Sequence, residues 1–208
     1  MRDRTITAFL SGCVVAVAVS ARAEPAPEPS AGPERGEVAR PYHLAVGATV
    51  DLLPIALSAS VGQLGASGQV WVGVDHVRLR LVGARIAFPD WLAGKDGFQD
   101  QRTLVGALLV DYVAGAHFDG WWLGTGFEFW HSSIGHADEG DMRVSWNTPV
   151  WTLGGGYIVP VRGNFYVEPW AAGHVALTDP APAIDARTYH PERLNAEVSL
   201  KLGIFLDL

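Results

Sequence analysis

The last twelve residues of the 208-residue chain alternate strictly between two kinds of side chain. Every second position is aliphatic: Val198, Leu200, Leu202, Ile204, Leu206 and Leu208. The positions between them hold Glu197, Ser199, Lys201, Gly203, Phe205 and Asp207. Successive side chains point to opposite faces of a β-strand, whereas a helix repeats every 3.6 residues. The segment therefore predicts a strand with one aliphatic face and one face of mixed charged and small residues.

Similar alternation recurs along much of the chain. It is found in segments 69–75, 77–81, 104–114, 122–130 and 165–177. A longer first strand is expected over Tyr42–Val61, with Pro54 as an irregular position inside it. No uninterrupted apolar stretch after residue 23 approaches 18 residues, which argues against a membrane-spanning helix. Together with the connections between them, the segments predict eight strands.

The expected connections alternate between short and long. Short turns are predicted at 75–76, 117–119 and 162–164, and longer polar loops at Pro89–Arg102, Ser132–Ser145 and Thr178–Arg193. Up-and-down membrane barrels have short turns on one side of the bilayer and long loops on the other. We therefore predict an all-β fold, an eight-stranded antiparallel up-and-down transmembrane β-barrel.

The position of the charged residues favours a barrel in lipid over a soluble sandwich, which is the alternative. Charged residues share a face with glycine and alanine, which suit a narrow lumen, and the wholly apolar face would meet lipid. Aromatic residues near the expected strand ends suit the membrane–water boundary: Tyr42, Trp91, Trp121, Trp130, Trp146 and Phe165. Arg85 departs from the scheme, because an unbroken register places it on the lipid face. A bulge near Gly83 or a position near the outer interface would accommodate it.

The N-terminus predicts export. Arg2 and Arg4 precede an apolar run that ends before Ala21-Arg22-Ala23, the pattern of a cleaved signal peptide over residues 1–23. A lipoprotein signal ending at Cys13, the single cysteine, is the alternative. Residues 24–41 are rich in Pro, Ala and Glu and are expected to be disordered, and 42–208 form the barrel domain. The net charge of −7 argues against a nucleic-acid partner.

These features resemble the small outer-membrane β-barrel proteins of the OmpA, OmpX and OmpW types. The resemblance rests on the signal peptide, the eight alternating strands and the terminal strand Leu200–Leu208, in which Leu208 replaces the usual final aromatic residue. It implies a location in the bacterial outer membrane and a monomeric state. The partners that it implies are outer-membrane lipid, lipopolysaccharide and the barrel-assembly machinery.

A set of ionisable residues is predicted to face the lumen. Its members are Asp51, Arg78, Arg80, Asp111, Glu128, Glu168, His174, Glu197 and Lys201. Because buried charges must be paired, the set predicts an ion-pair network that fills the barrel. A proton path or narrow polar conduit is the functional alternative, although eight strands leave little room for one.

A second candidate site lies after the fifth expected strand. His131-Ser132-Ser133 is similar to the His-x-Ser motif of outer-membrane lipid A deacylases, which implies His131 as base, Ser133 as nucleophile and Glu139 as the orienting acid. Those enzymes have Asn after the Ser, where this chain has Ile134. The same loop could hold a divalent cation through His136, Asp138, Glu139 and Asp141, although solvated acids are the commoner case. No cofactor motif is present.

The sequence thus leaves three functions open. The first is a structural, adhesive or surface-binding outer-membrane protein without catalysis. The second is a lipid A deacylase-like hydrolase, and the third is a narrow channel for small solutes.

Overall fold

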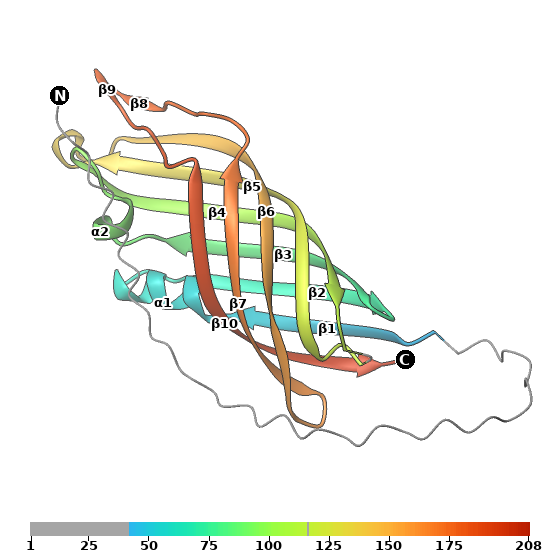
Figure 1. Ribbon diagram of the computed structural model, residues 1–208. Coiled ribbons are helices and arrows are strands. Elements are labelled where there is room, and N and C mark those ends of the chain that lie inside the picture. The colour runs from blue at the N-terminus through green and yellow to red at the C-terminus, as the bar shows by residue number, and fades with distance from the viewer. Residues whose placement is uncertain (1–41, 116) are drawn as a thin grey trace, which may run out of the picture. The chain divides into compact units, whose positions relative to one another are not determined.

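The computed structural model describes residues 42–115 and 117–208. The predicted signal peptide and the Pro/Ala/Glu-rich segment lie outside the described residues. The described chain forms one closed antiparallel barrel, which confirms the predicted fold class (Figure 1). None of the helices in these residues is long and apolar enough to cross a membrane.

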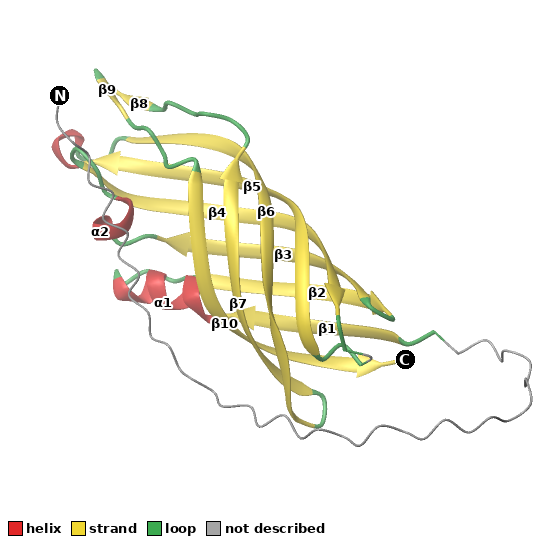
Figure 2. Ribbon diagram, in the orientation of Figure 1, coloured by secondary structure: helices red, strands yellow, loops and turns green. Residues whose placement is uncertain are grey.

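Eight strands close the barrel in the order β1-β10-β7-β6-β5-β4-β3-β2 (Figure 2). Their bounds are β1 Leu44–Asp51, β2 Ala66–Val74, β3 Val77–Ala87, β4 Phe98–Val113, β5 Gly120–His136, β6 Arg143–Arg162, β7 Phe165–Ala176 and β10 Leu194–Asp207. The first and last strands close the sheet, with Asp51 opposite Lys201 and Val50 opposite Leu202. Closure satisfies the backbone groups that an open sheet would leave unpaired at its edges.

The aliphatic face of each strand points outward. In β10, Leu200, Leu202 and Ile204 are 39%, 46% and 47% exposed, whereas Lys201 between them is 3% exposed. The same alternation of exposed and buried positions runs along β2, β3 and β4. An apolar exterior around a polar interior is the inverse of a soluble barrel, and it is stable only where lipid surrounds the strands.

The two ends of the barrel differ in the length of their connections. The short connections that follow β2, β4 and β6 lie at one end, near the start of β1 and the C-terminus (Figure 1). At the other end lie the helices α1 Leu52–Ser60 and α2 Asp90–Ala93, the 3-10 turn η1 Ala137–Glu139, and a small hairpin of β8 Ala183–Ile184 and β9 Arg187–Thr188. We call these the turn end and the loop end. Longer loops are external in outer-membrane barrels, so we expect the loop end to be the external one if the barrel lies in such a membrane.

Inward-facing glycines make room for aromatic side chains at the turn end. A Cβ at Gly73 would overlap the ring of Phe118, and one at Gly203 would overlap the ring of Tyr166. Both rings are almost fully buried. The small residues on the charged face therefore serve to pack large side chains into a narrow lumen, as the sequence suggested.

The first predicted strand is too long. β1 ends at Asp51, and the helix α1 occupies most of the remaining segment. Asp51 caps this helix, because its carboxylate accepts a hydrogen bond from the Leu53 amide at 3.2 Å. Pro54 lies in the first turn of the helix, where an amide hydrogen has no intrahelical partner and its loss costs little.

Two of the predicted loops are also too long. β4 begins at Phe98, inside the predicted loop Pro89–Arg102, and a register shift between Gln99 and Arg102 marks its irregular start. β5 continues to His136 and β6 begins at Arg143, inside the predicted loop Ser132–Ser145. The strands extend here through polar residues, whose composition conceals the continuing alternation.

Arg85 lies on the outer face, as an unbroken register requires. The pairing of β3 with β2 and with β4 runs past Gly83 without a bulge. Arg85 is near the loop end of β3 and opposite Ala66, the first residue of β2, so its position at the outer edge accommodates the charge.

Two aromatic residues do not lie where the sequence predicted. Tyr42, Trp121 and Phe165 are exposed outside the barrel at the turn end, whereas Trp130 and Trp146 face the interior. Trp91 lies on α2 and is exposed. The alternation itself places Trp130 inward, two residues from Glu128, so a position near a strand end was the misleading signal.

Candidate functional site in the lumen

An ion-pair network crosses the middle of the lumen. The Arg78 Nε lies 2.7 Å from Asp111 Oδ2, and its Nη1 lies 3.0 Å from Glu168 Oε2. Arg80 donates to Asp111 Oδ1 at 2.7 Å and to Gln69 Oε1 at 3.1 Å. All three charged residues of the Arg78 cluster are fully buried, or nearly so, and they come from strands on opposite sides of the barrel. The network therefore ties β3 and β4 to β7 through the lumen.

Lys201 extends the network around the wall. Its Nζ lies 3.8 Å from Glu168 Oε1 and 3.6 Å above the ring of Trp170. The Trp170 indole N–H donates to Asp51 Oδ2 at 3.0 Å, and the Ser199 hydroxyl donates to the other oxygen of that carboxylate. Asp51 therefore both caps α1 and joins the lumenal charges to the closing seam of the barrel.

The strand register explains why these side chains meet. Arg78 is directly opposite Asp111, and Lys201 is directly opposite both Asp51 and Glu168 on its two neighbouring strands. Residues directly opposite each other in an antiparallel pair share a face. The contact from Arg78 to Glu168 spans the lumen and depends on closure.

An aromatic layer lies on the turn-end side of the network. It consists of the buried residues Trp71, Phe118, Trp122 and Tyr166, with Ala45, Val113 and Ile158. The Tyr166 hydroxyl lies 2.7 Å from Thr49 Oγ1 and accepts a hydrogen bond from Trp71 Nε1 at 3.0 Å. The Arg80 guanidinium lies over Trp122, 4.7 Å from the ring centroid. Together, network and aromatic layer fill the lumen across its width.

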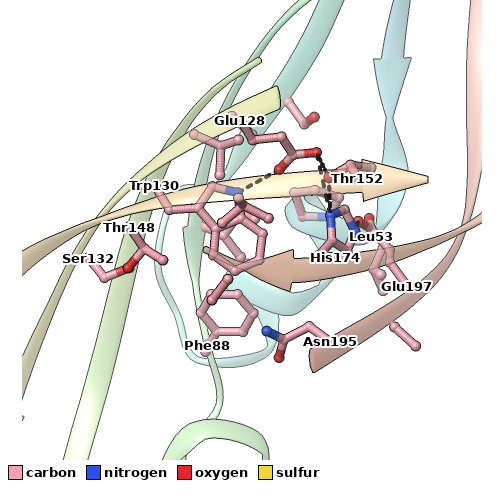
Figure 3. A pocket seen from close by; sticks show the side chains of 18 of the residues that line it. Leu53, Phe88, Glu128, Trp130, Ser132, Thr148, Thr152, His174, Asn195 and Glu197 are labelled. Atoms are coloured by element: carbon pink, nitrogen blue, oxygen red, sulfur yellow. Dashed lines mark hydrogen bonds and ion pairs between the residues drawn. The ribbon is translucent and has the colours of Figure 1, made fainter. Parts of the chain in front are cut away.

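A second cluster lies nearer the loop end. Nδ1 of His174 is 3.4 Å from Glu128 Oε1, and its Nε2 is 3.4 Å from Glu197 Oε2 (Figure 3). The Thr152 hydroxyl lies 2.8 Å from Glu128 Oε1 and 2.9 Å from His174 Nδ1. The Trp130 indole N–H donates to the other Glu128 oxygen. We call Glu128, His174 and Glu197 the mouth cluster.

A cavity of about 430 Å³ extends from the network past the mouth cluster to the external connections. Residues of α1, α2 and the β7–β10 connection line its outer part. Tyr189 holds that connection over the mouth, with its hydroxyl 3.0 Å from Gln101 Oε1 and 3.2 Å from the Ala93 carbonyl oxygen. Burial, and then the nearby Glu192 carboxylate, raise the pKa of Tyr189, so the hydroxyl keeps its proton for these contacts.

The sequence reasoning placed all nine predicted lumenal residues on inward faces, and the structure has each of them buried or half-buried in the lumen. It missed the neutral partners Gln69, Thr152, Trp130, Trp170 and Tyr166. Alternation was a usable signal for Trp130, which shares a face with Glu128, and for Trp170, which shares one with Glu168, whereas the strands of Gln69 and Thr152 carry no predicted charge. Tyr166 shares a face with Glu168, two residues on.

The predicted hydrolase residues are not joined into a triad. His131 and Ser133 both lie on the outer face near the loop end, where His131 Nδ1 is 2.8 Å from Asn147 Oδ1. The Ser133 hydroxyl accepts a hydrogen bond from Arg143 at 3.2 Å. Glu139 lies 3.7 Å from Arg187. Among residues 42–115 and 117–208, no hydrogen bond links His131 to Ser133 or to Glu139, so catalysis stays a prediction without geometric support.

An arginine from another segment contacts the acidic loop that was a candidate cation site. Arg187 of β9 lies 3.1 Å from Asp138 and 2.9 Å from the buried His136 Nδ1. Within the described part of the chain, no group of three or more His, Cys, Asp or Glu side chains is arranged to hold a metal ion.

One comparison with a solved structure, that with a Thermus thermophilus protein, supports the fold. No protein-family model matches the sequence, and no curated protein matches it. The chain is similar in structure to a major outer membrane protein from Thermus thermophilus, with a TM-score of 0.52 and 11% identity over 80% of this chain and 100% of that one. It also aligns with the N-terminal β-barrel domain of Pseudomonas aeruginosa OprF, with a TM-score of 0.47 and 12% identity over 79% and 96% of the two chains. Neisserial surface protein A gives a TM-score of 0.43 and 12% identity over 78% and 95%.

The location follows from the fold and the exterior together. A closed antiparallel barrel of eight strands with an outward apolar band is the architecture of bacterial outer-membrane proteins. The protein is an integral outer-membrane β-barrel.

Proposed function

We propose that the protein is a sealed, non-catalytic barrel that presents its loop end at the cell surface in a structural or ligand-binding role. The observation that carries this proposal is the filled lumen. Arg78, Asp111 and Glu168 bridge it from wall to wall, and the buried rings of the aromatic layer close it on the turn-end side. The cavity at the loop end stops at this barrier.

Conduction through the lumen would require the barrier to open. Separating Arg78 from both of its carboxylates would leave unpaired charges in a narrow, largely dry space, which costs several kcal/mol. Eight strands provide a lumen that side chains fill, and here they fill it. The geometry therefore supports a binding surface better than a solute channel.

The outer face near the loop end supports contact with lipopolysaccharide as a further part of the proposal. Arg102 and Arg143 both contact Asp100, at 2.9 Å and 2.6 Å, and Arg85 is exposed near the loop end of the neighbouring strand β3. Two guanidinium groups on one carboxylate, with Arg85 on the same outer face, leave an excess of positive charge where anionic lipid headgroups would lie. We further propose a monomer assembled by the usual barrel-assembly machinery, since closure leaves no strand edge free to pair.

Recording from planar bilayers tests the sealed barrel. Purified protein should insert and give a flat current in a symmetric KCl solution, whereas an open porin in the same set-up gives discrete steps. The variant Glu128→Gln serves as a control, and it should also be silent because Glu128 lies outside the barrier. Regular current steps in the wild type that change size in Glu128→Gln would overturn the proposal in favour of a channel.

An assay of acyl release tests the absence of catalysis. Lipid A incubated with the folded protein should keep all of its acyl chains. Release of fatty acid by the wild type, together with its loss in a folded Ser133→Ala variant, would establish the hydrolase instead.

A further inference from the structure

The loop-end half of the lumen contains more carboxylate than cation. Deeper in the barrel, three cations are matched by three carboxylates: Arg78, Arg80 and Lys201 with Asp51, Asp111 and Glu168. In the mouth cluster, by contrast, Glu128 and Glu197 share a single imidazole, that of His174. Even a fully protonated His174 would neutralise only one of these two carboxylates.

The cluster is built as a site and is open on one side. Glu128 is held from three directions by Trp130, Thr152 and His174. Glu197 has a side chain that is 23% exposed toward the cavity, and its contact in the cluster is with His174. The His174 side chain is 6% exposed, and its Nε2 faces Glu197 Oε2 at 3.4 Å without meeting hydrogen-bond geometry within the described residues. The Glu197 carboxylate therefore has acceptor capacity left for a donor from a ligand or a water.

The walls of the cavity are largely apolar. Phe88, Trp130, Trp146 and Tyr189 line it, together with aliphatic residues such as Leu53. Aromatic faces attract organic cations, and more strongly where water is excluded. A volume of about 430 Å³ lies within the range of small-molecule sites.

We propose that this cavity binds an organic ammonium ion with an apolar body. The ammonium group lies against Glu197 and Glu128, and the body packs along the aromatic wall. An anionic amphiphile such as a fatty acid would bring a third negative charge to the cluster and is disfavoured. The rim does not reverse this preference, because Lys95 is 3.7 Å from Glu192, and Arg193 is exposed where water and salt screen it.

Three matched small molecules test the proposal, which rests on the surface-binding role proposed above. Phenethylamine, 2-phenylethanol and phenylacetate each have a phenyl ring separated by two carbon atoms from a terminal nitrogen or oxygen. At pH 7 they are a cation, a neutral molecule and an anion, respectively. Each is titrated calorimetrically into the full protein in lipid nanodiscs at pH 7. Phenethylamine should bind at least about tenfold more tightly than the alcohol, and phenylacetate should bind least. Equal affinities, tighter binding of phenylacetate, or no binding of the amine would overturn the proposal.

Two variants locate the site. Glu197→Gln should weaken phenethylamine binding by about tenfold or more, because it removes the carboxylate that faces the cavity. Asp141→Asn removes the same charge from an exposed position in the β5–β6 connection and should leave the affinity within about twofold. Equal losses in both variants would point to a general surface-charge effect and contradict the site. If Glu197→Gln does not fold, the ranking of the three molecules on the wild type still decides.

The outcome is separable from the proposed function. A barrel that is electrically silent but does not bind phenethylamine disproves only the ligand class. A barrel that conducts disproves the sealed lumen, whatever the titrations show.

Discussion

Arg78 lies in the centre of the lumen with its guanidinium shared between Asp111 and Glu168. Replacing it by glutamine would remove the closest cation from the buried Glu168 and one of the two arginines from Asp111, a change that costs roughly 3–5 kcal/mol. We therefore expect Arg78→Gln to lower the free energy of unfolding by about that amount. Urea titration of the protein in liposomes, followed by tryptophan fluorescence, measures it.

The matched control for this prediction is Arg85→Gln on the same strand. Arg85 is exposed on the outer face near the loop end, so its replacement should change the free energy of unfolding by less than about 1 kcal/mol. Equal destabilisation by the two substitutions would show that the ion pairs of Arg78 in the lumen do not contribute more to stability than the exposed Arg85.

For single residues, the sequence predicted which side of a strand each side chain faces, but not which other side chain it contacts. The period-two pattern placed Arg78, Asp111 and Glu168 on the inward side because the pattern reports side-chain direction directly. It could not pair Arg78 with Glu168, since that contact crosses the barrel and depends on closure, strand tilt and register. His131 shows the converse problem, because a three-residue motif gives residue types without their orientation.

The helix α1 lies where the sequence analysis expected a strand, and the shorter elements α2, η1, β8 and β9 lie where it expected loops. The alternating pattern of β1 continues into an apolar segment, and Leu52–Ser60 reads equally well as strand or helix by composition alone. The cap at Asp51 and the position of Pro54 in the first turn decide for the helix. Short apolar runs of this kind are ambiguous by periodicity, whereas the long strands with clear alternation, such as β10, are not.

Ser58 fastens α1 to the barrel. Its hydroxyl donates to the Pro54 carbonyl oxygen at 2.8 Å and accepts from the Ala87 amide at 2.9 Å, at the loop end of β3. Ser58→Ala would leave the buried Ala87 amide unpaired, at a cost of about 1–3 kcal/mol. We expect faster hydrogen exchange at Ala87 and faster proteolytic cleavage near α1, with the strands unaffected.

Ser60→Ala provides the comparison for that element. Ser60 is exposed and bonds within the helix to the Leu57 carbonyl oxygen. Its replacement should leave exchange at Ala87 unchanged. If both serine variants behave alike, the link between α1 and β3 does not hold the helix in place.

The architecture of the whole molecule follows from the separation of apolar and polar side chains onto opposite faces of the sheet. Aliphatic side chains cover the outside, and charges and glycines occupy the inside, so the strands must close around a polar interior and be surrounded by lipid. The sequence predicted this architecture because alternation over long segments survives errors at their ends. It overestimated the loops, since the polar residues at the loop ends of β4, β5 and β6 remain in strands.

A nitroxide scan of β10 tests the orientation of the strands most directly. With Cys13 replaced by serine, single cysteines at successive positions from Glu197 to Ile204 are spin-labelled in the protein reconstituted in lipid, except at Lys201 and at Gly203, where a side chain would overlap Tyr166. Oxygen, which concentrates in the bilayer, should collide more often with labels at 198, 200, 202 and 204 than with labels at 197 and 199. Uniform collision rates, or high rates at 197 and 199 instead, would contradict a barrel with its aliphatic face in lipid.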